Sequence, residues 1–258
     1  MASASKDKVP AYAWLVFALT FGLLISDYMA RQVLNAVFPL LKADWSLTDG
    51  QLGFLSGVVA LMVGLLTIPI SLLADRLGRV KSIAAMAMLW SVATLLCGLA
   101  QNYEQMLAAR VLVGVGEAAY GSVGIAVIIS VFPRHLRATL TGAFMAGGLA
   151  GQILGVSIGG LVAAAHGWRM AFLAIGAGGL LLALAYPLFV RESRLNAGEK
   201  PERGVVTLGS LRSLFAGAQL QCAYIGSGLS LLAAAALPAW LPTFFLPYYG
   251  LPLEMAAP

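Results

Sequence analysis

Two charged residues lie inside an apolar segment of the sequence, where their chemistry would be unusual. Arg110 and Glu117 are seven residues apart in the run Arg-Val-Leu-Val-Gly-Val-Gly-Glu-Ala-Ala-Tyr-Gly at 110–121. On an α-helix this spacing is about two turns, so both side chains point to the same side with about 10 Å of rise between them. A charge within a membrane costs at least about 3 kcal/mol unless it faces a protein interior or a wet cavity. The pair therefore predicts one wall of a pathway.

A second pair of opposite charges, Asp27 and Arg31, lies in the first apolar segment and is four residues apart. This spacing places both side chains on one face of a helix. Two interpretations stay open. The pair is either a structural ion pair, because opposite charges neutralise each other at low dielectric constant, or part of a polar site inside the membrane.

The composition indicates an integral membrane protein. Hydrophobic residues make up 60% of the chain and charged residues 10%, and the mean hydropathy is +0.88. A soluble domain of 258 residues could not bury so much apolar surface in one core. The net charge of +5 comes from residues between the apolar segments, without a basic face interleaved with aromatic residues, so we expect no nucleic-acid partner. Cys97 and Cys222 lack metal-ligand spacing, and we expect two buried thiols and no bound metal.

Seven apolar segments are each about as long as a bilayer requires. The first begins at residue 11 and continues past Asp27 towards Leu41; we interpret it as an uncleaved span because no small-residue cleavage site follows it. The other six segments are 51–73, 83–100, 105–132, 138–165, 168–190 and 219–245. We therefore expect an all-α membrane protein with four parts: an N-terminus (1–10), a six-helix bundle (11–190), a polar linker (191–213) and a region with a seventh helix (214–258).

The lysine and arginine residues predict the orientation of these spans. Only Lys42 and Arg169 fall on one side of the predicted membrane. The opposite side holds Lys6, Lys8, Arg76, Arg79, Lys81, Arg134, Arg137, Arg191, Arg194, Lys200, Arg203 and Arg212. By the positive-inside rule the N-terminus and the linker are cytoplasmic.

The turn after the second span, at 71–81, carries a distinctive set of polar residues. Asp75 could cap a helix or pair with Arg76 or Arg79, and Gly78 relaxes the backbone limits of the turn. We interpret the set as a cytoplasmic gating motif. The alternative is a basic loop without a special role.

These residues resemble the major facilitator superfamily. The segment 71–81 is similar to that superfamily's signature between helices two and three, with Ser71 in place of the usual Gly. Arg110, Gly114 and Gly116 resemble its fourth-helix motif, and Gly167-Trp168-Arg169 with Phe172 resembles the entry to its sixth helix. The fifth-helix antiporter motif is matched by Gly142, Gly151, Gly155, Gly159 and Gly160. Val156 occupies the position of that motif's Pro, which leaves the direction of coupling open.

Within the superfamily, two segments resemble the spinster-type branch. They are Gly114-Val115-Gly116-Glu117-Ala118 with Tyr120, and Asp27-Tyr28-Met29-Ala30-Arg31, which is similar to the branch's Asn-Tyr-x-Asp-Arg. Ala30 stands where the branch has an acid. If that acid takes part in proton coupling, either Asp27 has taken over its role or the coupling is different or lost.

The resemblance implies a secondary active transporter that works by alternating access, with no cofactor and no catalytic residue. Helices one and four would line a central cavity, so the two charge pairs would meet there. Tyr28, Tyr120, Gln32 and Asn35 would be their polar neighbours. Such a site suits a small anionic or zwitterionic solute, lipid-like ones included. Arg31 or Arg110 would hold the solute, and Glu117 would accept a proton. Symport, antiport and uniport all stay open.

The glycines at 151, 155, 159 and 160 form a smooth stripe that would let another helix approach closely. Packing alone explains the stripe, and hinging during transport is compatible with it.

Major facilitators have two six-helix halves, and this chain matches the first half, the linker and one helix of the second. A cavity with one wall cannot alternate its access, because the motion needs two bundles. We therefore expect a fragment of a longer transporter, or a half that needs a second bundle or an oligomer partner, in a bacterial inner membrane. The alternative is a half that does not transport and acts as a membrane interaction protein.

Overall fold

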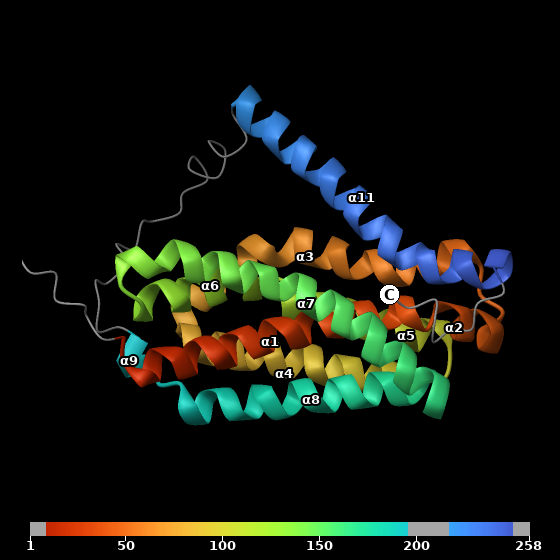
Figure 1. Cartoon of the computed structure of the whole chain (residues 1–258), viewed down its shortest axis with the longest axis horizontal. Helices are drawn as coiled ribbons and strands as arrows, with labels where there is room; N and C mark the ends of the chain where they lie inside the picture. Colours follow the sequence, from red (N-terminus) through yellow and green to blue (C-terminus); the bar gives the residue numbers. More distant parts are fainter. Residues whose placement is uncertain (1–8, 196–216, 250–258) are drawn as a thin grey trace, which may run out of the picture.

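The computed structural model describes residues 9–195 and 217–249, with only some side chains of the last helix. All regular structure in these residues is helical (Figure 1). The helices are α1 (Ala11–Ala36), α2 (Phe38–Trp45), α3 (Asp49–Leu77), α4 (Arg79–Leu99), α5 (Tyr103–Glu117), α6 (Tyr120–Val131), α7 (Arg134–His166), α8 (Trp168–Phe189), α9 (Glu192–Leu195) and α11 (Ala218–Tyr249).

Six segments are long and apolar enough to cross a membrane: α1, α3, α4, α7, α8, and α5 and α6 taken together. The prediction of an all-α, multi-pass membrane protein is therefore confirmed. The seventh predicted span falls on α11, many of whose side chains lie outside the described residues. Residues 192–195 of the predicted linker form α9, whereas most of that linker, like residues 1–8, also lies outside them.

Two predicted spans are interrupted. The first does not run to Leu41, because α1 ends at Ala36 and α2 begins at Phe38. Pro39, in the first turn of α2, lacks an N–H group and suits a new helix start better than a helix interior. The fourth predicted span is divided into α5 and α6 immediately after Glu117.

Local sequence sets the ends of several helices. Thr48 and Gln51 form a capping box at the start of α3. Gly78 and Gly167 have φ angles of +95° and +86°, in the region that favours glycine, and they form the turns between α3 and α4 and between α7 and α8. These turns let consecutive helices run back along one another.

The helices form one bundle in which α1 is central (Figure 1). Helix α1 packs against α7 and α8, α4 packs against α5 and α8, and α3 packs against α5. The largest fully buried side chains include Trp90, Arg110, Tyr120, Tyr186, Phe38, Phe144 and Phe172. One of these side chains is that of Arg110, so the interior contains a buried charge as well as apolar groups.

Helix α7 lies unusually close to α1 at its glycines. A Cβ atom added at Gly151 would lie 2.8 Å from the carbonyl oxygen of Ile25, and one added at Gly155 would lie 2.8 Å from the Cα of Met29. Side chains larger than hydrogen would therefore meet the backbone of α1. At Gly159 the nearest atom, a methyl carbon of Val33, would be 3.0 Å away, and Gly160 is also buried.

Helix α11 approaches the bundle only towards its C-terminal end (Figure 1). There the Trp240 ring lies 5.8 Å from that of Phe38, and a Cβ at Gly53 would lie 3.6 Å from the Trp240 ring. The N-terminal part of α11 is exposed, and so is its Cys222. The expectation of two buried thiols is therefore right for Cys97 and wrong for Cys222.

We expect Gly155→Ala to lower the stability of the bundle by about 1–3 kcal/mol, because the new methyl group would collide with the backbone of α1. Thermal unfolding of the purified chain in detergent measures the effect. The matched control is Gly142→Ala on the same helix, where a Cβ would meet no atom within 4 Å. Both changes gain the helix propensity of alanine, so equal stability of the two variants would contradict the close approach.

Candidate functional site

Helices α1 and α5 bring the predicted charge pairs together near the middle of the bundle. The Nε atom of Arg31 lies 2.6 Å from Oε2 of Glu117, the last residue of α5. The Arg31 side chain is 26% exposed, whereas that of Glu117 is fully buried. The N–H of Arg31 Nε does not point at the carboxylate, so the contact is an ion pair and not an aligned hydrogen bond.

Asp27 is the second buried acid of this cluster. Only 4% of it is exposed, and its side chain lies within hydrogen-bonding reach of Glu117. As carboxylates, neither side chain can donate a hydrogen bond to the other. Within the part of the chain that the structure describes, no aligned donor reaches Asp27 Oδ1 or either oxygen of Glu117. The sequence pattern paired Asp27 with Arg31, but the closest measured ion pair joins Arg31 to the other helix.

Arg110 belongs to the same level of the bundle but has different partners. It is 1% exposed. Its guanidinium donates to three backbone carbonyls: Nη1 to Ala30 at 3.0 Å, Nη2 to Arg31 at 3.3 Å and Nε to Leu55 at 3.3 Å. The sequence left open whether Arg31 or Arg110 faces a solute, and only Arg31 is partly exposed.

The two predicted tyrosines occupy different environments. Tyr28 is partly exposed, and its ring centroid lies 5.5 Å from the guanidinium carbon of Arg31, a cation–π distance. Tyr120 is fully buried, and its hydroxyl donates to the carbonyl of Thr20 at 2.5 Å. The ring of Tyr120 packs edge-on against Trp90. Tyr28 therefore lies at the partly exposed side of the cluster beside Arg31, whereas Tyr120 joins helices in the core.

A row of amides and a hydroxyl continues along α1 from the charged cluster. The amide nitrogen of Asn35 donates to Oε1 of Gln32 at 2.5 Å, and the hydroxyl of Ser56 on α3 donates to Oδ1 of Asn35 at 3.2 Å. Gln32 and Ser56 are partly exposed. These residues place neutral hydrogen-bonding groups next to the positively charged guanidinium of Arg31.

The break between α5 and α6 follows directly after Glu117, and it was missed from the sequence. Ala118 and Ala119 lie between the two helices. The hydroxyl of Thr67 on α3 lies 2.7 Å from the carbonyl oxygen of Ala118 and 2.5 Å from that of Val63 in its own helix, so its one proton is shared between the two carbonyls. Alanine has the highest helix propensity, so no residue here signals a break. The hydroxyl of Thr67 supplies a donor to a carbonyl within the membrane, as an interrupted helix requires.

Comparison with known proteins decides the family. The sequence matches the Major Facilitator Superfamily over residues 20–258. This chain belongs to that superfamily. It is 27% identical over 249 residues to a probable L-galactonate transporter of Escherichia coli (strain K12), covering 92% of this chain and 55% of the relative. It is also 29% identical over 182 residues to a gallate transporter of Pseudomonas putida, covering 70% of this chain and 39% of the relative.

The fold of this superfamily member is similar to a solved bacterial homolog of the human lysosomal transporter Spinster, in an inward-facing and unoccupied conformation. The TM-score is 0.82 at 25% identity, covering 98% of this chain and 58% of the other. The predicted resemblance to the superfamily and its spinster-like members is confirmed. The relatives named here are transporters or homologues of a transporter, and none of them is named as an enzyme. The chain spans about half the length of these relatives.

The turn between α3 and α4 carries the superfamily signature. It is stabilised by an acidic residue that was not predicted from the sequence. The carboxylate of Glu192, at the start of α9, accepts from the backbone N–H of Arg79 at 3.0 Å and of Val80 at 2.7 Å. Asp75 and Arg76 are exposed and make no hydrogen bond or ion pair within the described ranges. The helix-capping role expected of Asp75 therefore belongs to Glu192, which is 113 residues from Arg79 in sequence.

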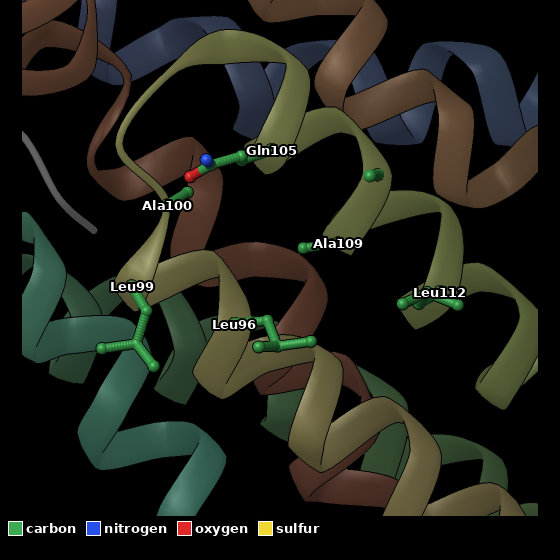
Figure 2. A pocket seen from close by; sticks show the side chains of 7 residues that line it. Leu96, Leu99, Ala100, Gln105, Ala109 and Leu112 are labelled. Atoms are coloured by element: carbon green, nitrogen blue, oxygen red, sulfur yellow. The ribbon is translucent and has the colours of Figure 1, made fainter.

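An apolar hollow of about 270 Å³ lies between α4 and α5, apart from the charged cluster (Figure 2). Its lining residues are Leu96, Leu99, Ala100, Gln105, Ala108, Ala109 and Leu112. The carbonyl oxygen of the Gln105 side chain already accepts from the backbone N–H of Gln101. The lining has no charged residue, so this hollow does not suit an anionic solute, unlike the cluster around Arg31.

We expect Glu192→Ala to destabilise the chain by about 1–2 kcal/mol, because two backbone N–H groups at the start of α4 would lose their charged acceptor. Thermal unfolding in detergent measures the loss. Asp75→Ala is the matched control, since it removes an exposed acid of the same turn. A larger loss in Asp75→Ala than in Glu192→Ala would show that Asp75, and not Glu192, stabilises this turn.

Proposed function

We propose that this chain provides the first six-helix bundle of a proton-coupled transporter of small organic acids. Arg31 binds the carboxylate of the solute, and Glu117, with Asp27 beside it, accepts the proton. The transporter works by alternating access between this bundle and a second one, in a bacterial inner membrane with the N-terminus in the cytoplasm. The gating motif of Asp75, Arg76, Gly78 and Arg79 contacts the second bundle.

The unequal burial of the Arg31–Glu117 ion pair carries this proposal. Glu117 is fully buried, so its carboxylate is held inside the protein, whereas 26% of the Arg31 side chain is exposed. A solute can therefore reach the arginine and not the glutamate. Guanidinium groups bind carboxylates with two parallel hydrogen bonds, which suits an organic acid.

The names of the relatives support the solute class. L-galactonate and gallate each carry a carboxylate together with several hydroxyl groups. The partly exposed Gln32 on α1 and Ser56 on α3 can form hydrogen bonds with such hydroxyls. Tyr28, beside Arg31, adds an aromatic surface for the body of the solute.

The ion pair also supports a coupling mechanism. Glu117 and the solute carboxylate compete for the same guanidinium. A proton on Glu117 removes the negative charge that holds Arg31, so proton binding and anion binding favour each other. Asp27 provides a second oxygen site for the proton within reach of Glu117. This linkage leads to proton–anion symport, in which acid outside drives the solute inward.

The second candidate function is a membrane interaction protein that does not transport. The observation that favours it is the exposed apolar face of α3, which includes Leu61, Leu65 and Ile68. Of the residues in the most apolar part of α3, only 17% are buried within this chain. The face suits contact with another helix bundle, either a second half or a separate partner.

Uptake into vesicles that contain the chain paired with a second six-helix bundle tests the proposal, since one bundle cannot alternate its access. Labelled L-galactonate and gallate would be supplied outside, with and without an imposed acid-outside gradient. We expect gradient-driven uptake that Arg31→Gln lowers about tenfold or more, the effect of losing about 1.4 kcal/mol of anion binding. We expect Glu117→Gln to bind the solute without responding to the gradient.

Arg169→Gln is the matched control, because Arg169 lies at the outer end of the bundle, where it pairs with Asp44. It should leave the uptake unchanged. Gradient-driven uptake that survives in Glu117→Gln would contradict the proton role. Absence of uptake for both acids, with both bundles correctly inserted, would favour the second candidate.

A further inference from the structure

Arg110 is a deeply buried charge of the cluster, and its hydrogen bonds go to the backbone. Its three bonds, to Ala30, Arg31 and Leu55, join α5 to α1 and α3 at one level of the bundle. None of its hydrogen bonds within the described residues goes to a carboxylate. Arg110 therefore uses its donors to hold helices together.

Two of these three bonds end on the peptide groups from which the Arg31 side chain begins. The carbonyls of Ala30 and Arg31 lie on either side of the Arg31 Cα. Charged donors form the stronger kind of hydrogen bond, so this attachment resists rotation or sliding of α1 at that point. Glu117, seven residues later on α5, holds the other end of the same side chain at 2.6 Å. Helix α5 therefore contacts Arg31 at two places, its backbone and its guanidinium group.

We propose that Arg110 is a positioning residue for Arg31 and does not bind the solute. By fixing α1, it sets the Arg31 guanidinium between Glu117 and the open side of the bundle. The inference rests on the proposed function only in taking Arg31 as the anion-binding group. It assigns different tasks to the two arginines of the site: Arg31 binds the anion, and Arg110 holds Arg31 in position.

Direct binding of a solute by Arg110 would require a large rearrangement. The side chain is 1% exposed, and a carboxylate could reach it only after its bonds to Ala30 and Arg31 were broken. Those carbonyls would lose their charged donor at the same time. Arg31 offers its guanidinium without that loss.

Phenylglyoxal, which reacts with accessible guanidinium groups, tests the assignment without any transport. The purified chain in detergent is treated with the reagent, and the modification of each arginine is followed by mass spectrometry of its peptides. We expect Arg31 to react in the folded protein and Arg110 to react only after unfolding. Reaction of Arg110 as fast as Arg31 in the folded chain would overturn the proposal, because Arg110 would then face the open side.

The variant Arg110→Met tests the positioning role, because methionine keeps an apolar side chain of comparable length and removes all three donors. We expect the reaction rate of Arg31 to rise several-fold towards the rate in Glu117→Gln, since α1 is no longer fixed opposite Glu117. In the double variant Arg110→Met with Glu117→Gln the rate should rise no further. An unchanged Arg31 rate in folded Arg110→Met would overturn the proposal.

Arg169 provides two matched controls. It donates to a backbone carbonyl, that of Ala100, at the outer end of the bundle. Its reaction rate should stay the same in Arg110→Met, and Arg169→Met should leave the rate of Arg31 unchanged. A general loss of stability in Arg110→Met would raise the reaction rates of Arg31 and Arg169 together. That result would count against the proposal. If Arg110→Met does not fold, the comparison of Arg31 with Arg110 in the unaltered chain still decides.

These measurements separate the inference from the proposed function. They need neither a solute nor a second bundle. Absence of uptake in vesicles together with the expected reactivities would contradict transport by this chain and support the positioning of Arg31. Uptake together with an unchanged reaction rate of Arg31 in Arg110→Met would support transport and contradict the positioning of Arg31.

Discussion

The neutralisation of buried charge is the constraint on which the rest of this structure depends. An isolated charge inside a membrane protein is costly, so each ionised group needs an opposite charge or several dipoles. Glu117 meets the requirement through Arg31 on another helix, at 2.6 Å. Arg110 meets it through three peptide carbonyls. Both solutions cross from α5 to α1, so the two helices are held together where the charges lie.

Helix α1 is consequently fixed on several sides. The glycines of α7 let the two backbones come together at Ile25 and Met29. Tyr120 of α6 binds the carbonyl of Thr20 nearer to the start of α1. What remains partly exposed towards the C-terminal end of α1 includes Tyr28, Arg31 and Gln32. The rigid contacts therefore leave a polar surface of α1 open, and a solute site on that surface is supported by a fixed helix.

The sequence predicted the features that depend on residue type, and it missed those that depend on the backbone. Apolar segment lengths located the helices, and charges in apolar surroundings identified the buried cluster. No residue pattern indicated that the partners of Arg110 are carbonyls, because every residue has one. The α5–α6 break at Ala118 follows no local preference, since alanine favours a helix. Glu192 was missed because its contact with Arg79 spans 113 residues and only folding brings the two together.

The α5–α6 break connects the charged cluster to α3. Ala118 follows Glu117 directly, and its carbonyl is held by the hydroxyl of Thr67 on α3. The same helix α3 is followed by Gly78, which lies beside the carboxylate of Glu192, and it carries the exposed apolar face with Leu61 and Leu65. The hydrogen bond of Thr67 thus joins the backbone next to Glu117 to the helix that carries this exposed apolar face.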